Sequence, residues 1–508
     1  MPIATIHRSV GGAVAAFVVG LGIMLADPIV PSAVAQADAG SAGGTGLEES
    51  SQSHFVRVQG TDLVVDGEPY HFLGVNLWYA MNLGSSGPSG DRARLRRELD
   101  RLDSLGVTNL RIMAGSEGPA SEPHRVTPAL QPAPGEFNED LLRGLDYALA
   151  EMEKRDMRAV LCLNNFFQWT GGMAQYVSWA TDTEIPYPHE EDHSWNDFQQ
   201  YATRFYVNEQ AQQPFFDLIY TLVHRTNTVT GEVYREDPTI MAWQLANEPR
   251  GFGNAEHYVR WVDRTAGVLQ ALDPNHLVSL GGEGTLFPVT NTRFEEVGRL
   301  PEIDYLTAHL WLENWGWYDP QAPDSTYTSG VGRMMGYVAH QVSLAREIGK
   351  PIVFEEFGVG RDGGRYDPKA PTTYRDRFYE TLFEMLRKMA QEGEPVAGGN
   401  VWSWTGEARP PEAGGFWAVG DPLTGDPPHE RQGWYSIYDT DTTTVQLLGR
   451  YARRMNALGN EEDSNKASTA VRLRPADLVP HEGPDVVTLL TLAQIERVGP
   501  YVRTEMYE

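Results

Sequence analysis

One glutamate stands directly after an apolar segment, where its carboxyl group could serve as an acid in catalysis. Residues 243–249 read Trp-Gln-Leu-Ala-Asn-Glu-Pro, so that Asn247 and Glu248 follow the apolar part. Pro249 prevents regular strand pairing from continuing. Asn247 would then be placed to hydrogen-bond a hydroxyl group of a bound sugar. The alternative is that Asn-Glu-Pro only caps the next helix.

Glu355 and Glu356 repeat this pattern after the apolar residues 352–354. Because side chains alternate along a strand, we expect only one of the two to point into a site at the strand end. The alternative is that one pairs with an arginine and the other is solvated. Glycoside hydrolysis needs two carboxyl groups, one that protonates the leaving oxygen and one that attacks the sugar. Glutamates at the ends of two different strands therefore point to that chemistry.

The elements that must position these residues alternate regularly along the chain. Helical patterns occupy residues 92–105, 139–155, 199–226 and 374–391. The expected strands are residues 72–77, 108–113, 159–163, 241–246, 277–280, 305–310, 352–354 and 400–404. Eight such units predict a (β/α)8 TIM barrel of the α/β class, with the fifth and sixth units the weakest. Turn signals within residues 55–71 predict an N-terminal β-hairpin.

Active sites of such barrels lie at the carboxyl ends of the strands. The residues found there are unusually polar or aromatic: Asn76, Arg111, Asn164, Asn165, Asn247, Glu248, His309, Glu355, Glu356 and Trp402. We therefore expect them to meet in one site.

The N-terminus has the features of an export signal. Arg8 precedes an apolar run at residues 10–26, and small residues follow at 33–35. We predict a signal peptide at 1–37, a flexible leader at 38–53, a catalytic domain at 54–458 and a short C-terminal extension at 459–508 without an assigned role. The protein would be secreted, with a periplasmic or cell-surface location, or an uncleaved membrane anchor, as alternatives.

The net charge of −28 argues against nucleic acid and anionic membranes as partners, since both require basic surfaces. A neutral polymer suits such a surface, and we expect a monomer with no membrane contact after signal cleavage. Cys162 is the single cysteine, so no intramolecular disulfide can form.

Two short motifs are rejected as cofactor sites. Residues 189–193 match His-Glu-X-X-His, but prolines precede them and no helix pattern carries them, so we expect an acidic loop within 184–193. Residues 358–363 match Gly-X-Gly-X-X-Gly, yet glycine and prolines follow instead of a helix. We predict no organic cofactor and no catalytic metal.

Seven stretches carry a resemblance to a known family: residues 164–173, 244–249, 303–311, 314–317, 355–358, 425–430 and 432–434. They occur in family order between residues 55 and 458. The chain resembles glycoside hydrolase family 5, in particular its endo-β-1,4-mannanase branch.

The resemblance implies that Glu248 is the acid/base and Glu356 the nucleophile, with Glu355 structural. It places Arg111 beneath Glu356, where a positive charge would keep that carboxylate ionised. We expect substrate contacts from Arg111, Asn247, His309, Trp311, Trp402, Asn165, Trp169 and Trp78. For any single aromatic residue among these, ordinary core packing is the alternative.

Two tryptophans complicate the transfer of roles. Trp404 points to the same face as Trp402 and competes with it as the floor of the sugar site. Trp311 stands where the family usually has a tyrosine that donates a hydrogen bond to the nucleophile. An indole N–H can also donate such a bond.

The leading hypothesis is a retaining endo-β-1,4-mannanase that acts on β-mannan or manno-oligosaccharides. Exo-acting β-mannosidase or mannobiohydrolase activity, or β-1,4-glucanase activity, would use the same two glutamates. The segments 166–194 and 406–434 could wall off one end of the cleft and decide between these modes. A catalytically silent carbohydrate-binding protein is the alternative from another class.

Overall fold

The computed structural model describes residues 54–188 and 192–459. The predicted signal peptide, the leader and all but the first residue of the C-terminal extension lie outside the described residues. Residues 189–191 of the His-Glu-Glu-Asp-His sequence also lie outside them.

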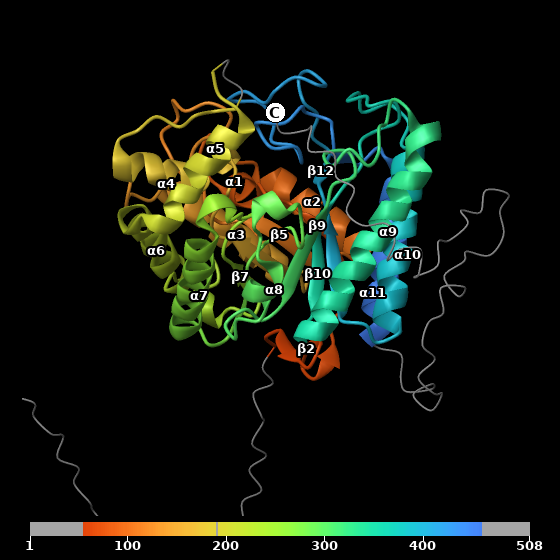
Figure 1. Ribbon diagram of the computed structural model, residues 1–508, viewed down its shortest axis with the longest axis horizontal. Coiled ribbons are helices and arrows are strands. Elements are labelled where there is room, and N and C mark those ends of the chain that lie inside the picture. Colours follow the sequence, from red (N-terminus) through yellow and green to blue (C-terminus); the bar gives the residue numbers. More distant parts are fainter. Residues whose placement is uncertain (1–53, 189–191, 460–508) are drawn as a thin grey trace, which may run out of the picture. The chain divides into compact units, whose positions relative to one another are not determined.

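Eight parallel strands form a barrel with helices around it, which confirms the predicted fold class (Figure 1). The strands are β4 (Phe72–Asn76), β5 (Asn109–Met113), β6 (Arg158–Cys162), β7 (Ile240–Gln244), β8 (Leu277–Ser279), β9 (Leu306–Leu310), β10 (Ile352–Phe357) and β11 (Val396–Val401). They pair in the order β8-β7-β6-β5-β4-β11-β10-β9. A parallel bridge between Ser279 and Tyr305 joins the first and last of these and closes the ring.

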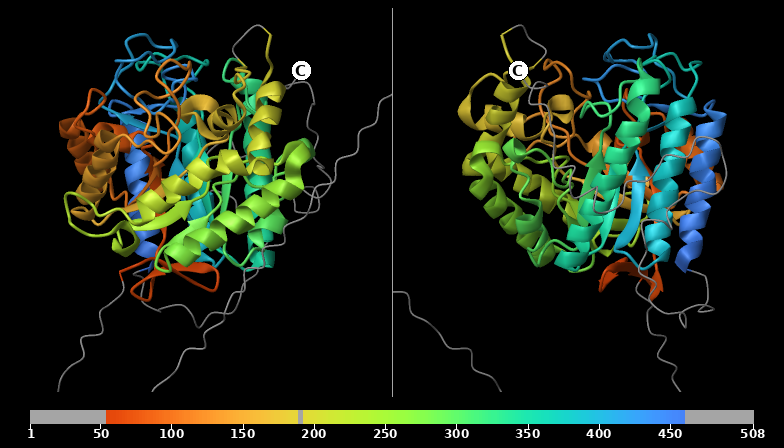
Figure 2. Two further views of the ribbon diagram at one scale, coloured as in Figure 1. Left: turned by 90° about the vertical axis from the view of Figure 1, so that its left-hand side faces the viewer. Right: turned by 45° about the vertical axis from the view of Figure 1, so that its right-hand side comes forward.

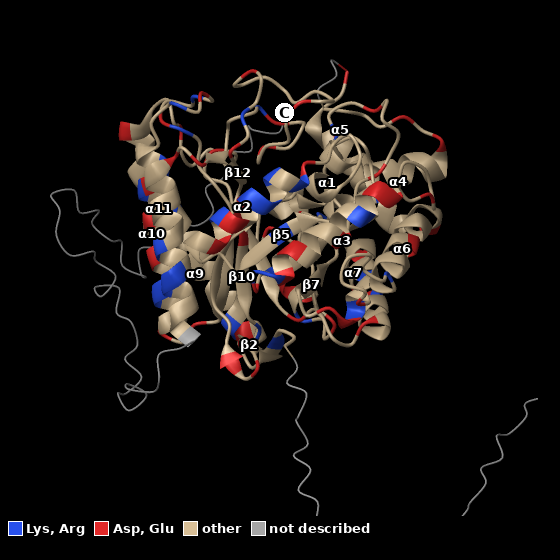
Figure 3. Cartoon of the chain, turned by 180° about the vertical axis from the view of Figure 1, so that it is seen from behind, with Lys and Arg blue, Asp and Glu red and all other residues tan. Residues whose placement is uncertain are grey.

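The helices cover the outside of this barrel (Figure 2). They are α1 (Ala80–Gly84), α2 (Arg92–Leu105), α3 (Glu139–Glu153), α4 (Gly172–Thr181), α5 (Trp195–Ala202), α6 (Glu209–Val223), α7 (Ala255–Leu272), α8 (Phe294–Gly298), α9 (Pro323–Ile348), α10 (Thr373–Gln391) and α11 (Thr442–Asn456). Acidic and basic residues are interspersed along these helices (Figure 3). None of the helices in the described part of the chain is both long and apolar enough to cross a bilayer.

Three elements differ from the prediction. The N-terminal hairpin has a third strand and forms an antiparallel sheet of β1 (Arg57–Gln59), β2 (Asp62–Val65) and β3 (Glu68–Pro69). The helix expected at 199–226 is broken into α5 and α6, because Asn208 caps α6 through hydrogen bonds from Gln210 and Ala211. The eighth strand begins at Val396, and Trp404 belongs to the separate strand β12 (Trp404–Gly406), which pairs with β13 (Ile437–Tyr438).

The small sheet closes the end of the barrel opposite the long connections (Figures 1 and 2). Val56 and Leu63 are buried there with Phe72, Val160 and Met241 of the barrel strands. The carboxyl ends of the strands, and the connections that follow them, are thus left to form a site.

Candidate active site

Glu248 lies beyond the end of β7 in a backbone conformation that is rare for a residue with a side chain. Its φ is 49°, in the left-handed region. Its backbone N–H donates to the carbonyl of Gly281 at 2.9 Å, so the segment after β7 remains hydrogen-bonded to the segment after β8. Such strained residues persist only where the surroundings fix them, and they cluster at functional sites. The fold therefore holds Glu248 in one position at the barrel mouth.

A bulge in β10 brings both Glu355 and Glu356 inside the barrel. The pairing of β10 with β9 skips Glu355, so that Glu356 lies opposite His309. Both carboxylates therefore form ion pairs with Arg111, and the expected alternation fails at this point. Glu355 is buried below the site and accepts two hydrogen bonds from Gln244 at 2.7 and 2.8 Å, whereas Glu356 lines the cavity above it. The two glutamates thus have different surroundings.

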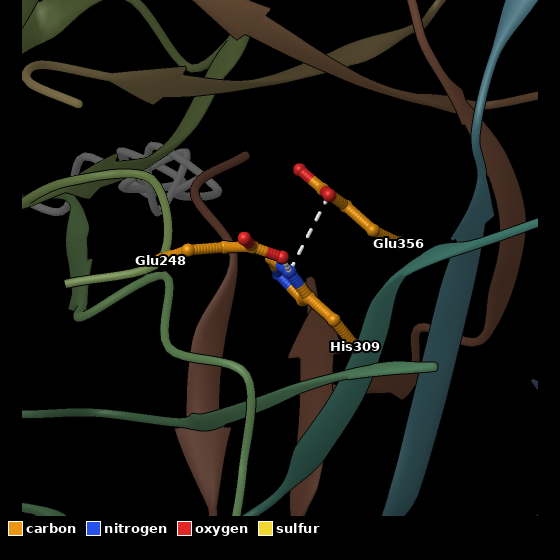
Figure 4. Close-up of side chains that lie close together, drawn as sticks. All are labelled: Glu248, His309 and Glu356. Atoms are coloured by element: carbon orange, nitrogen blue, oxygen red, sulfur yellow. Dashed lines mark hydrogen bonds and ion pairs between the residues drawn. The ribbon is translucent and has the colours of Figure 1, made fainter. Parts of the chain in front are cut away.

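His309 lies between the two candidate catalytic glutamates (Figure 4). Its Nδ1 is 2.6 Å from Oε1 of Glu248 and 3.4 Å from Oε2 of Glu356. One nitrogen of His309 and one oxygen of each glutamate all lie within 4.8 Å of one another. These side chains are of types that bind metal ions, and here hydrogen bonds and ion pairs join them to one another and to Arg111.

Arg111 anchors the floor of the site from β5. Its guanidinium contacts Glu356 and donates to Asn247 Oδ1 at 2.9 Å, to Gln244 Oε1 at 2.7 Å and to Asn76 Oδ1 at 3.2 Å. Side chains from four barrel strands, or from the residues just after them, therefore meet at one buried guanidinium group. Its position beneath Glu356 agrees with the expectation from the resemblance.

Burial and charge shift the pKa values of the three central groups in different directions. Burial raises the pKa of Glu356 to about 7, against the opposing effect of the nearby His309 and Arg111 charges. Burial also disfavours the Glu248 carboxylate, but hydrogen bonds from His309 and Trp311 and the charge of Arg250 bring its pKa below the usual value. For His309, burial is outweighed by Glu356, Glu248 and Glu355, and the pKa rises to about 10. The imidazole is therefore protonated and shares its proton with Glu248.

A cavity of about 420 Å³ opens over these groups. Its lining combines carboxylates, amides and many aromatic rings: Phe167, Trp169, Trp195, Gln199, Asn247, Glu248, Arg250, Glu283, Trp311, Asn314, Trp315, Glu356, Trp402, Phe416, Pro427, His429, Glu430, Arg431 and Trp434. Aromatic walls with a few convergent polar groups are typical of ligand sites, and the volume lies in their usual range.

Six of the predicted site residues line this cavity: Glu248, Glu356, Asn247, Trp311, Trp402 and Trp169. The other four, for which substrate contact was expected, stand one layer behind it: Arg111, His309, Asn165 and Trp78. Arg111 and His309 hold the two glutamates. Asn165 accepts a hydrogen bond from Asn247 at 3.2 Å, and Trp78 packs edge-on against Trp169 at 5.3 Å. Each of the four contacts at least one residue that lines the cavity.

The two uncertain tryptophan roles are resolved by hydrogen bonds. Trp404 is fully buried and donates its indole N–H to Glu98 at 2.9 Å, away from the cavity. Trp402 lines the cavity and packs against Trp311. The indole of Trp311 donates to Glu248 at 3.1 Å, so the role of donor to the nucleophile does not transfer to it.

Two long connections meet over the cavity. We name residues 163–188 and 192–194 the β6 loop and residues 407–436 the β12 loop. The ring of His429 in the β12 loop lies parallel to Trp169 at 6.5 Å and edge-on to Trp195, just beyond the β6 loop, at 6.4 Å. Phe416 of the β12 loop reaches His124 at 6.2 Å. These contacts bring the two connections together at the cavity, which both of them line.

Glu430 is the main site residue that sequence reasoning missed. The stretch 425–430 was recognised as a family feature, but no chemistry was assigned to it. Among the described residues no donor reaches the buried Oε2 of Glu430. Burial, with the charges of Asp426, Glu356 and Glu248, raises the pKa of Glu430 well above its usual value. Glu430 therefore contributes a buried carboxyl group to the cavity wall.

Buried side chains hold the β12 loop in shape around Glu430. The carboxylate of Asp426 accepts backbone N–H groups of Gly433 and Tyr435, each at 2.7 Å. The amide of Gln432 donates to the carbonyls of Asp426 and Pro427 at 3.0 and 3.1 Å. On the other side of the cavity Arg250 and Glu283 form a bidentate ion pair at 2.6 and 2.8 Å, which sequence reasoning also missed.

Comparison with known proteins gives consistent matches. The family described as "GH family 5 beta-mannosidase-like" matches residues 53–460. The putative mannan endo-1,4-beta-mannosidase 9 of Oryza sativa subsp. japonica is 30% identical over 376 residues, covering 70% of this chain and 84% of that protein. The crystal structure of a glycoside hydrolase family 5 mannosidase from Rhizomucor miehei has a TM-score of 0.75 and 39% identity, covering 81% of this chain and all of the other. A variant of that mannosidase, in complex with mannosyl-fructose, is 38% identical with a TM-score of 0.75, covering 81% and 99% of the two chains.

Proposed function

This chain belongs to the β-mannosidase-like members of glycoside hydrolase family 5, and we propose that it releases single mannose units from the ends of β-1,4-linked manno-oligosaccharides and mannan. Family membership establishes a glycoside hydrolase with mannosidase or mannanase activity. The mode of attack, the stereochemistry and the role of each residue are the proposal.

The proposal that attack occurs at a chain end rests on the side of the cavity where the two loops meet. There the ring of His429 in the β12 loop lies against Trp169 of the β6 loop and against Trp195 at the start of α5, and a chain that continued in that direction would meet these rings. Glu430 follows His429 in the chain and also lines the cavity. A terminal sugar has a free hydroxyl where an internal sugar has a glycosidic oxygen. A protonated carboxyl group can both donate to and accept from such a hydroxyl.

The two central glutamates support a double displacement. Glu356 attacks the anomeric carbon as the glycosidic bond breaks, and Glu248 protonates the departing oxygen. Glu248 then removes a proton from water, which attacks the same carbon and frees Glu356. Oxygens of the two carboxyl groups within 4.8 Å of each other favour this route, because inversion requires room for a water between them.

His309 supplies the proton that Glu248 needs. Glu248 is the more acidic of the two glutamates, the reverse of what its role in the first step requires. The proton of His309 lies on the existing 2.6 Å hydrogen bond. Its transfer gives a neutral imidazole and a protonated Glu248, while Arg111 continues to stabilise the carboxylate of Glu356.

The aromatic floor would orient the terminal sugar. Trp402 offers its ring to a sugar face, and its indole N–H is buried without a partner among the described residues. Asn247 lines the cavity with Nδ2, which donates one hydrogen to Asn165 and has a second available. The amide is therefore placed to reach the 2-hydroxyl of the sugar.

Internal cleavage is the second candidate, and it was the leading hypothesis from the sequence. The 30% identity to a protein named as a mannan endo-1,4-beta-mannosidase favours it. The 39% identity to a family 5 mannosidase over the full length of that protein supports mannosidase activity, and the meeting of the two loops favours release from chain ends.

Early products from mannohexaose decide between the two modes. Attack at chain ends gives mannose and mannopentaose first, whereas mannobiose and mannotriose as first products would establish internal cleavage. NMR of the new anomer tests the mechanism separately. The β anomer is expected first, and the α anomer would overturn retention without affecting the mode of attack.

We also propose that the enzyme is exported and acts outside the cytoplasm as a monomer. The proposal rests on the features of residues 1–37. Mass spectrometry of the protein from culture medium should find a mature N-terminus near residue 38. An intact Met1 in a cell-bound protein would contradict export with cleavage.

A further inference from the structure

An aromatic ring stands partly in solvent at the mouth of the cavity. Phe416 is 44% exposed, yet it also lines the cavity. Val419 in the same loop is more exposed, at 70%, and does not line it. Exposed single apolar residues are common and need no explanation. At the rim of a carbohydrate site, however, an exposed aromatic ring can stack against the apolar C–H face of a sugar ring.

Backbone and side-chain contacts fix the Phe416 ring in place. The preceding residues pair with the segment that carries Glu430: Gly414 N–H donates to Gln432 at 2.7 Å, and Gln432 N–H donates to Gly415 at 2.9 Å. The Arg431 guanidinium lies 4.6 Å from the centre of the Phe416 ring and donates to the carbonyl of Gly414 at 2.9 Å. A ring held in this way loses little conformational entropy when a ligand stacks on it.

We propose that Phe416 forms a platform for the second sugar of the substrate, the unit from which the terminal mannose is cut. The inference rests on the proposed attack at chain ends. If the terminal mannose lies against Trp402 and Glu430 inside the cavity, the next sugar must lie at the mouth. Phe416 is the most exposed of the aromatic residues that line the cavity, and Arg431 holds its ring in position.

Replacement of the ring tests this platform by comparing two substrates. Mannotriose extends to the mouth, whereas β-mannosyl fluoride occupies only the terminal position. For Phe416→Ala we expect KM for mannotriose to rise roughly five- to tenfold, the value of one stacking contact, and to rise more than KM for β-mannosyl fluoride. Phe416→Trp should restore the wild-type ratio of the two KM values. Val419→Ala is the matched control from the same loop.

The outcomes separate the platform from the mode of attack. Equal KM changes for both substrates, or no change for either, would overturn the platform. A Phe416→Trp variant that behaves like Phe416→Ala would do the same. The mode of attack is tested independently by the first products of the unaltered enzyme from mannohexaose.

Discussion

Nδ1 of His309 lies 2.6 Å from Oε1 of Glu248. One proton is thus shared across a buried hydrogen bond, and the imidazole that holds it also faces Glu356 at 3.4 Å. The protonation state of each glutamate therefore depends on His309.

Replacing His309 should shift the pH dependence of catalysis. The positive charge of His309 lowers the pKa of Glu356, which burial has raised to about 7. In His309→Gln we expect that pKa to rise, so that Glu356 becomes ionised only at higher pH. The low-pH limb of the kcat/KM profile reports ionisation of groups in the free enzyme. This limb should shift to higher pH by roughly one unit. Profiles between pH 4 and 10 measure this, with the exposed His340→Gln as control. A limb that stays in place, or moves to lower pH, would exclude this coupling.

External nucleophiles should distinguish the roles of the two glutamates. Glu356→Ala and Glu248→Ala are each expected to lower the rate on mannobiose by roughly a thousandfold or more. With azide and a dinitrophenyl β-mannoside, Glu356→Ala should form the α-mannosyl azide, because azide enters where Glu356 stood. Glu248→Ala should form the β-mannosyl azide from the covalent intermediate. NMR of the products identifies each anomer, and an exchange of the two results would reverse the assignment.

The arrangement of the barrel was predictable because apolar segments and helical patterns alternate so regularly. Glu248 and Glu356 could be chosen because each follows such a segment. The eighth strand was placed too late since Gly398 and Gly399 resemble a turn. A Cβ at Gly398 would lie 2.6 Å from the carbonyl oxygen of Phe72, and one at Gly399 would lie 2.9 Å from that of Phe354. Close packing inside the barrel, which sequence periodicity does not reveal, requires these glycines.

The bulge at Glu355 and the role of Glu430 could not be predicted for related reasons. A bulge depends on the pairing of β10 with β9, and nothing in the local sequence marks it. Glu430 reaches the cavity through a loop whose shape depends on the buried hydrogen bonds of Asp426 and Gln432. Trp78 and Trp402 looked alike as aromatic residues near strand ends. Only packing shows that Trp78 lies behind Trp169.

Loss of Glu430 should weaken recognition of the chain end. In Glu430→Ala we expect kcat/KM for mannobiose to fall roughly 10- to 100-fold, since a buried hydrogen-bonding partner of the terminal sugar is lost. The space left in the wall should also allow mannobiose to appear among the early products from mannohexaose. Chromatography of timed samples follows both effects. Glu412→Ala, an exposed glutamate in the β12 loop, is the control. Wild-type products and rates in Glu430→Ala would remove Glu430 from the site.

Buried Glu117 should make the stability of the barrel depend on pH. It accepts hydrogen bonds from Gly172 N–H at 2.7 Å and Tyr176 at 3.1 Å, and burial raises its pKa to about 8. Because the folded state then holds a proton that the unfolded chain has lost, the free energy of unfolding should fall between about pH 4.5 and 8. The slope approaches about 1.4 kcal/mol per pH unit. Glu117→Gln should lose this part of the slope.

Thermal unfolding between pH 5 and 9 measures the effect of Glu117. Glutamine fits the same contacts, since its oxygen can accept from Gly172 and its amide can donate to Tyr176, whose hydroxyl donates to Gln131 at 3.0 Å. The exposed Glu184→Gln is the control. Parallel curves for Glu117→Gln and the unaltered protein would show that this carboxyl group does not set the slope.

If attack is at chain ends, as proposed, the meeting of the β6 and β12 loops has a consequence for how the enzyme works on long polymers. For a site that admits only chain ends, the effective substrate concentration is the concentration of ends. It does not depend on the mass of polysaccharide alone. At equal mass, doubling the chain length halves the ends, so turnover of high polymers falls in proportion. Such an enzyme depends on other activities that cut polymers internally, and its natural partner reactions are those that generate short fragments.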